Sequence, residues 1–166
     1  MNLLLIILAI SAFSYFIFQL ISWIFGAGFE STRRKQLQSI IKFANPKYNE
    51  KIADLGSGSA KILLALKNSK AELHGYEINP MLVLLSKIKT RKIKNIHIHW
   101  KNLWKADLSK FNTIIIFQFF HLMPKLEKKI LKKCKPGTKI ISNTWKFPNL
   151  QPVKQEGKVR LYIIQK

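Results

Sequence analysis

Three consecutive isoleucines lie between Thr113 and Phe117, and this run most constrains the fold. A strand with one face in water alternates apolar and polar residues, whereas a parallel strand covered by helices on both faces is apolar throughout. Further β-rich runs occupy residues 51–55, 73–77, 96–100, 139–143 and 159–164. Helical runs separate most of them, which predicts an α/β fold: a Rossmann-like, parallel, doubly wound sheet with right-handed crossovers and helices on both faces.

The predicted helices cover residues 32–43, 60–67, 80–92 and 123–133. Ser31 or Thr32 can cap the first of them, and Asn79 followed by Pro80 is a typical helix start. The many lysines between residues 125 and 135 are interpreted as a solvated helix face.

The N-terminal segment has no charged residue from Asn2 to Phe29, and residues 3–25 are almost wholly apolar. A helix of that length measures about 34 Å, which is enough to cross a hydrocarbon core. No basic residue precedes it, in contrast to a signal peptide. We therefore expect one transmembrane helix. It gives two parts, an anchor with its exit turn over residues 1–28 and one catalytic domain over residues 29–166.

Arg33, Arg34 and Lys35 follow this segment directly. The positive-inside rule then predicts a single-pass membrane protein whose domain lies on the cytoplasmic side. The net charge of +21 indicates either an anionic surface nearby, which could be nucleic acid, anionic lipid or an acidic protein, or simply a lysine-rich, solvated protein surface.

Metal and disulfide chemistry receive little support from the sequence. Cys134 is the only cysteine, which excludes a disulfide framework and a thiolate cluster. His97 and His99 alternate on one strand face, but no carboxylate or thiol follows at ligand spacing, so no metal site is expected.

The clearest local motif is Asp-Leu-Gly-Ser-Gly-Ser-Ala-Lys at residues 54–61, between a predicted strand and a predicted helix. Glycines there allow a tight turn and close approach of a ligand to the backbone. Glu77 ends the next strand, where an acidic side chain can accept hydrogen bonds from ribose hydroxyls. Lys61 occupies the third-glycine position of a dinucleotide fingerprint, so a dinucleotide site is disfavoured. The spacing Gly-x-Gly-x-Ala instead resembles motif I of class I methyltransferases.

Four motifs in order make the resemblance more specific. They are Asp-Leu-Gly-Ser-Gly at 54–58, Gly-Tyr-Glu-Ile-Asn-Pro at 75–80, Asn-Leu-Trp-Lys-Ala-Asp-Leu-Ser at 102–109 and Met-Pro-Lys-Leu-Glu-Lys-Lys at 123–129. Together they resemble the small membrane-anchored lysine methyltransferases of mitochondria and their prokaryotic relatives. That family modifies the c subunit of ATP synthase and the adenine nucleotide translocase.

The resemblance implies S-adenosyl-L-methionine as the cofactor and a class I methyltransferase fold. It assigns the methionine part to the glycine loop, the ribose to the end of the second strand, and the adenine to the loop after the third. The cofactor-binding residues implied in this way are Asp54, Gly56, Gly58, Glu77, Asn102 and Leu103.

The acceptor side is implied to lie after the fourth strand, over residues 117–124. No catalytic residue is identified there, but Phe119, Phe120 and Trp145 are candidates for an aromatic wall that contacts a methylated cation. His121 could accept a proton or orient the substrate.

Three functions remain open. The first is a protein lysine methyltransferase acting on a membrane or membrane-adjacent protein. The second is a methyltransferase for nucleic acid or a small molecule. The third is a non-catalytic membrane adaptor, motivated by Ser59, Ala60 and Asn102, which stand where the family pattern has Asp, Gly and Asp.

Overall fold

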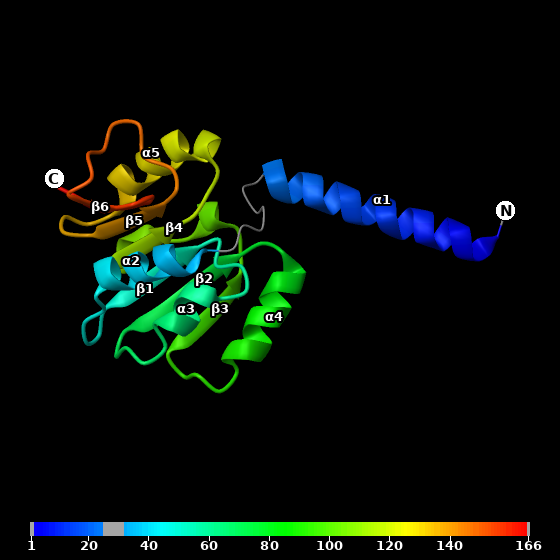
Figure 1. The fold of residues 1–166 in the computed structure, drawn as a ribbon, viewed down its shortest axis with the longest axis horizontal. Coiled ribbons are helices and arrows are strands. Elements are labelled where there is room, and N and C mark those ends of the chain that lie inside the picture. The colour runs from blue at the N-terminus through cyan, green and yellow to red at the C-terminus, as the bar shows by residue number, and fades with distance from the viewer. Residues whose placement is uncertain (1, 25–31, 166) are drawn as a thin grey trace.

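A seven-stranded sheet organises the chain (Figure 1). The computed structural model describes residues 2–24, with side chains to residue 17, and residues 32–165. The strands run in the order β3-β2-β1-β4-β5-β7-β6. Their bounds are β1 Lys51–Leu55, β2 Glu72–Glu77, β3 Ile96–Trp100, β4 Thr113–Ile116, β5 Lys139–Asn143, β6 Lys154–Glu156 and β7 Val159–Ile163. The first five are parallel, so their carboxyl ends meet at one edge of the sheet.

Helices cover both faces of the sheet, as predicted. Side chains of α2 (Arg34–Ala44) and α3 (Lys61–Ala65) form one apolar core with Ile115 of β4. On the opposite face, α5 (Met123–Lys133) packs over Ile114 and Ile116. The fourth helix, α4 (Pro80–Thr90), packs against β3 and β2 at the edge of the sheet. Three short 3₁₀ turns complete the elements: η1 Leu103–Lys105, η2 Leu108–Lys110 and η3 Phe120–Leu122.

The isoleucine run behaves as its sequence predicts. Ile114, Ile115 and Ile116 are all fully buried, and alternate members of the run contribute to the two opposite cores. Burial of each such side chain stabilises the fold by roughly 1.5–3 kcal/mol. The central strand therefore joins the two layers of the domain and fixes where its carboxyl end lies.

Two features of the sheet differ from the prediction. The last strand, β7, is antiparallel to both β5 and β6 instead of parallel. Gly157, with φ +55°, reverses the chain between β6 and β7 and makes them a hairpin. β6 was not predicted because its sequence, Lys-Gln-Glu, has no apolar alternation.

Two helix starts also differ. Ala60 has φ +63°, a left-handed conformation that cannot continue a helix, so α3 begins only at Lys61. The residue before α2 is Arg33 and not Thr32; its N–H donates to the Gln36 side chain at 3.0 Å. Ser31, the other predicted cap, lies outside the described residues.

The N-terminal segment forms a helix, α1 (Leu3–Ile24). Among the residues described, no helix has the length and hydropathy that crossing a membrane requires. The predicted transmembrane helix is therefore not supported. Phe25 and the exit turn, with the boundary after residue 28, fall outside the described residues. Large apolar side chains of α1, such as Leu3, Phe13 and Phe16, are exposed.

Candidate functional site

The glycine motif forms a tight turn at the carboxyl end of β1. Gly56 has φ +89° and Gly58 has φ +53°, and the N–H groups of Gly56 and Ser57 donate to the Tyr76 carbonyl at 2.8 and 3.1 Å. A Cβ atom on Gly56 would stand 2.2 Å from Nε2 of Gln118. Both the backbone angle and the lack of space therefore require glycine at this position.

Glu77 connects the end of β2 to this turn. Its side chain is buried, and its Oε2 accepts a hydrogen bond from the Gly58 N–H at 2.9 Å. Its Oε1 accepts from the N–H groups of Ile78 and Asn79, both at 2.8 Å. Three backbone donors thus hold one carboxylate at the edge where the parallel strands end, which is where nucleotide ligands bind in open α/β sheets.

Asp54 adds a second buried carboxyl group beside it. Burial, together with the charge of Glu77, raises the pKa of Asp54 to about 7. Because this pKa lies near neutrality, Asp54 keeps its proton in acid and ionises only as the pH passes about 7, so the fixed negative charge at this edge of the sheet is mainly that of Glu77. The pair favours a ligand that brings positive charge and hydrogen-bond donors.

The loop after β3 is the third part of the site. The side chain of Asn102 accepts a hydrogen bond from the Trp104 N–H at 3.0 Å and so caps η1, and Leu103 is buried. Asn102 performs this capping in place of the aspartate of the family pattern, because either side chain offers the same acceptor oxygen.

Lys129 of α5 holds this loop in place through three hydrogen bonds. Its Nζ donates to the carbonyls of Leu103, Trp104 and Ala106 at 3.0, 2.7 and 2.8 Å. Burial lowers the pKa of this amine. The prediction that the lysines of α5 form a solvated face was wrong for Lys129, which lies three residues after the buried Leu126 and whose amine reaches the η1 loop.

Two polar residues at the same edge escaped the sequence reasoning. Gln118 is buried and donates from Nε2 to the Leu55 carbonyl at 2.9 Å, while its Oε1 has no hydrogen-bond partner. Asn143, at the end of β5, is buried with both side-chain polar atoms unpartnered. Buried polar atoms without partners are costly, so we expect a ligand or an ordered water molecule to satisfy both groups. The only sequence signal was one glutamine within the apolar run Phe117-Gln118-Phe119-Phe120.

The four acceptor-side candidates form one group. The ring centroids of Phe119 and His121 lie 5.8 Å apart, those of Phe120 and His121 5.6 Å, and those of Phe120 and Trp145 5.5 Å. Phe120 and Trp145 are exposed, and they come from the ends of two neighbouring strands, β4 and β5. The structure therefore places an aromatic surface at the same edge as the glycine turn.

These residues fit S-adenosyl-L-methionine. Glu77 supplies a fixed carboxylate for vicinal hydroxyls, the positive φ angles of Gly56 and Gly58 form the tight turn beside it, and Asp54 adds a second carboxyl group at the same edge.

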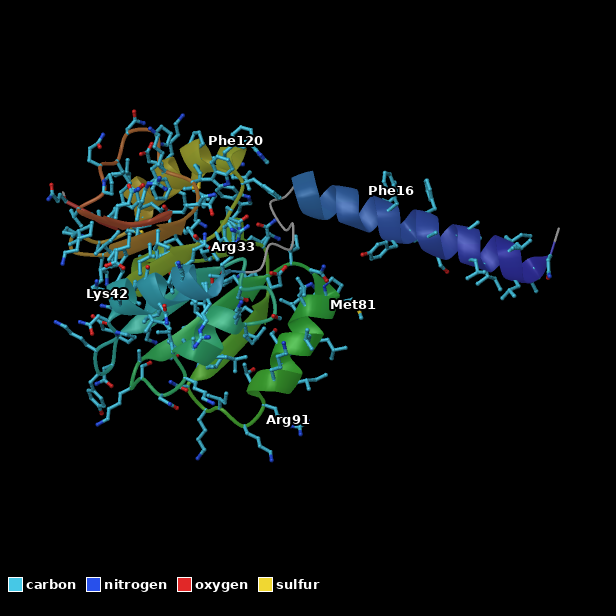
Figure 2. All side chains as sticks on the ribbon, in the orientation of Figure 1. Phe16, Arg33, Lys42, Met81, Arg91 and Phe120 are labelled. Atoms are coloured by element: carbon cyan, nitrogen blue, oxygen red, sulfur yellow. The ribbon has the colours of Figure 1, made fainter. Side chains whose placement is uncertain are left out.

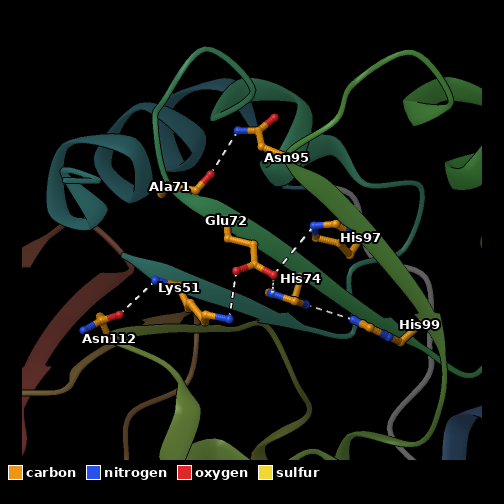
Figure 3. A network of polar contacts seen from close by, with 8 residues as sticks. All are labelled: Lys51, Ala71, Glu72, His74, Asn95, His97, His99 and Asn112. Atoms are coloured by element: carbon orange, nitrogen blue, oxygen red, sulfur yellow. Dashed lines mark hydrogen bonds and ion pairs between the residues drawn. The ribbon is translucent and has the colours of Figure 1, made fainter. Parts of the chain in front are cut away.

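A polar network at the opposite end of β2 is separate from this site (Figure 3). Glu72 lies 2.9 Å from the Lys51 Nζ and 3.0 and 3.7 Å from Nε2 of His74 and His97. The Nδ1 of His74 is 3.0 Å from the Nε2 of His99. Glu72 reaches His97 from the adjacent strand, a contact that residue spacing along the chain could not show, while His99 contacts His74. Within the described part of the chain, no group of these side chains is arranged to hold a metal ion.

Comparison with known proteins agrees with this geometry. Residues 54–154 match the ANTKMT methyltransferase domain. The lysine N-methyltransferase of Xenopus laevis that is named for the c subunit of ATP synthase is 31% identical over 105 residues, which are 61% of this chain and 46% of that protein. The adenine nucleotide translocase lysine N-methyltransferase of Mus musculus is 31% identical over 111 residues, which are 64% of this chain and 48% of that protein. The chain thus spans about half the length of the curated relatives it matches.

A solved structure supports the fold. An RNA methyltransferase from Salinibacter ruber, in complex with S-adenosyl-L-homocysteine, superposes with a TM-score of 0.77 at 20% identity, covering 81% of this chain and 94% of that one. Such low identity shows the fold alone, a class I methyltransferase fold. The family match covers more than half of the sequence and includes the glycine turn, Glu77 and the aromatic group. The chain therefore belongs to the ANTKMT methyltransferase domain family.

Proposed function

We propose that this protein transfers a methyl group from S-adenosyl-L-methionine to a lysine side chain of a membrane or membrane-adjacent protein. The observation that carries the proposal is the buried Glu77 carboxylate, bonded to Gly58 of the glycine turn at the end of β2. The relatives are named as lysine N-methyltransferases for the ATP synthase c subunit and for adenine nucleotide translocase, and these names support the acceptor class.

The residues around the turn bind and orient the reactants. Glu77 would accept hydrogen bonds from the ribose hydroxyls, Asp54 would lie beside the methionine part of the cofactor, and Asn102 with Leu103 would lie beside the adenine. When bound, S-adenosyl-L-methionine supplies an electrophilic methyl group. The contribution of the chain is mainly alignment and exclusion of water.

The aromatic group forms the acceptor side. Phe119, Phe120 and Trp145 would pack on the aliphatic stem of the substrate lysine, and their rings would contact the methylated cation that forms as the product. A lysine must lose its proton before it accepts a methyl group, and apolar walls favour the neutral amine. We assign that proton to His121, whose ring contacts Phe119 and Phe120 on this side of the site.

The protein acts at a membrane with its domain on the cytoplasmic side. Exposed apolar side chains on α1 support attachment to a lipid phase, and Arg33, Arg34 and Lys35 support the cytoplasmic side, because the cytoplasmic leaflet is rich in anionic lipid. A reporter fused to the C-terminus should read as cytoplasmic. A reading from the other side of the membrane would overturn this part of the proposal.

Calorimetry with S-adenosyl-L-methionine tests the cofactor site. Glu77→Ala should weaken binding by about 1–3 kcal/mol, the scale of a lost charged acceptor. Glu72→Ala is the matched control, because Glu72 begins the same strand at its other end and should leave the affinity unchanged. No binding by the wild type would favour the non-catalytic adaptor.

Methyl-labelled cofactor tests the acceptor. The purified protein, incubated with isolated membranes, should place the label on lysine side chains of membrane proteins, and Glu77→Ala should reduce it. Label in RNA or in a small metabolite, with none in protein, would select the second function instead.

A further inference from the structure

Helix α4 carries its apolar residues on the side that faces solvent. Met81, Leu84, Leu85 and Ile88 are 71%, 56%, 40% and 51% exposed, at the spacing of one helix face. The residues that turn inward are smaller and mostly polar: Val83, Ser86 and Thr90.

The inward-facing hydroxyl groups of Ser86 and Thr90 need no hydrogen-bond partner in the sheet. Ser86 donates to the Val83 carbonyl at 2.9 Å, and Thr90 donates to the Ser86 carbonyl at 2.8 Å. Their hydrogen bonds are satisfied within the helix, so this side can pack against β2 and β3 without an unpaired group. The helix α4 is therefore stable with its apolar residues facing solvent. These residues do not belong to the hydrophobic core of the domain.

Trp100 extends the apolar stripe. It ends β3 and is 67% exposed, and its indole Nε1 donates to the carbonyl of Ile78, just before α4, at 3.0 Å. The hydrogen bond fixes the polar atom of the ring while much of its surface stays open. We call Met81, Leu84, Leu85, Ile88 and Trp100 together the α4 face. Large apolar side chains gathered on one exposed helix face are typical of an interaction site.

The charges beside the α4 face are all of one sign. From residue 78 to residue 106 the sequence contains no Asp or Glu. Figure 2 shows α4 with its side chains, from Met81 at one end to Arg91 just beyond the other. Five exposed basic residues lie along and just beyond the helix: Lys87, Lys89, Arg91, Lys92 and Lys94.

An exposed apolar face flanked by basic residues favours one kind of binding partner. A second copy of the chain, docked through the same face, would set basic residues against basic residues. An anionic bilayer meets both requirements, because the apolar stripe and the indole enter the headgroup region while the basic residues attract lipid charge. We propose that the α4 face docks on the surface of an anionic membrane.

Docking would set the candidate cofactor site close to the lipid. α4 begins three residues after Glu77, and Asn79 accepts hydrogen bonds from the N–H groups of Met81 and Leu82 at its start. A substrate lysine near the membrane surface would then lie close to the site. Membrane docking through the α4 face agrees with the proposed action at a membrane, but it does not require that the protein transfers methyl groups.

A fluorescent label on the α4 face tests the proposal in the full-length protein. Met81→Cys carries an environment-sensitive label, and Tyr48→Cys carries the matched control label, because Tyr48 is 72% exposed on the loop before β1. Cys134 is buried and should not react in the folded protein. α1 is present in both variants, so any attachment that it makes is the same.

On vesicles containing phosphatidylserine, the label at position 81 should brighten and be quenched by brominated lipid, and the label at position 48 should not. High salt and the variant Lys87→Gln/Lys89→Gln should each reduce the response. Loss of two basic residues should weaken docking roughly 25-fold, at about fivefold for each. The same variant should keep the wild-type affinity for S-adenosyl-L-methionine, which separates this test from that of the cofactor site.

Four results would overturn the proposal. They are no change at position 81, equal changes at positions 81 and 48, and an equal response on pure phosphatidylcholine. The fourth is brightening that rises with protein concentration in detergent without lipid, which would assign the face to a second copy.

Discussion

The buried carboxyl group of Asp54 should make the stability of this protein fall as pH rises, and Asp54→Asn should remove that dependence. Burial and the charge of Glu77 raise the pKa of Asp54 from 3.8 to about 7. Each pKa unit corresponds to about 1.4 kcal/mol, so the ionised group costs the folded state roughly 4 kcal/mol. That is a large part of the stability of a domain of this size.

The sign follows from proton binding. Between the unfolded pKa near 4 and the folded pKa near 7, the folded protein keeps a proton on Asp54 that the unfolded chain has lost. The contribution of Asp54 to stability therefore declines as pH rises through this window. The penalty is complete above pH 7 and absent below pH 4. An asparagine side chain at this position would have the shape of aspartic acid without the charge.

Urea unfolding of wild type and Asp54→Asn, measured at several pH values, provides the assay. Other titrating groups are common to both proteins and cancel in the difference. The variant should gain little stability at pH 4 and roughly 4 kcal/mol by pH 8. A difference that stays constant from pH 4 to pH 8 would refute the argument, because it would show that the carboxyl group does not change its protonation on folding in this window.

Other changes should have distinct signatures. Gly56→Ala should destabilise the fold by at least about 1 kcal/mol and weaken cofactor binding, because its φ of +89° disfavours a side chain and its Cβ would collide with Gln118; urea unfolding and calorimetry would show both. Lys129→Met should cost about 1–3 kcal/mol in urea unfolding through loss of three carbonyl partners, whereas a comparable loss in the exposed neighbour Lys128→Met would contradict this role. Glu72→Gln should lose stability above the ordinary carboxyl pKa and match the wild type in acid, since Lys51 lowers the pKa of Glu72 in the folded state; equal pH profiles would contradict it.

The parts of the site that the sequence predicted are those encoded locally. Three consecutive isoleucines identified the buried strand β4, and glycines after a strand identified the cofactor turn. Glu77 was found because the position of an acidic residue at the end of the next strand is fixed by the βαβ geometry.

The parts that the sequence did not predict depend on contacts between distant segments. Glu72 and His97 belong to different strands, and only the register of β2 against β3 brings them together. Lysine is usually a surface residue. The role of Lys129 is visible only once the fold brings the carbonyls of the η1 loop within hydrogen-bonding distance of its amine. Asn143 is polar at the end of a strand, a common position, and its lack of partners could not be read from the chain.

The antiparallel strand β7 lies outside the part of the chain that matches the family, yet the domain needs this strand in order to fold. The family match ends at residue 154, but β7 lies between β5 and β6, and α2 packs on β5 and β7. Val159, Leu161, Tyr162 and Ile164 are buried, and together they stabilise the domain by about 6–12 kcal/mol. This is comparable to the whole stability of a small domain. A fragment of residues 54–154 would therefore keep the candidate site residues but lose the buried side chains of β7, and we expect that it would not fold.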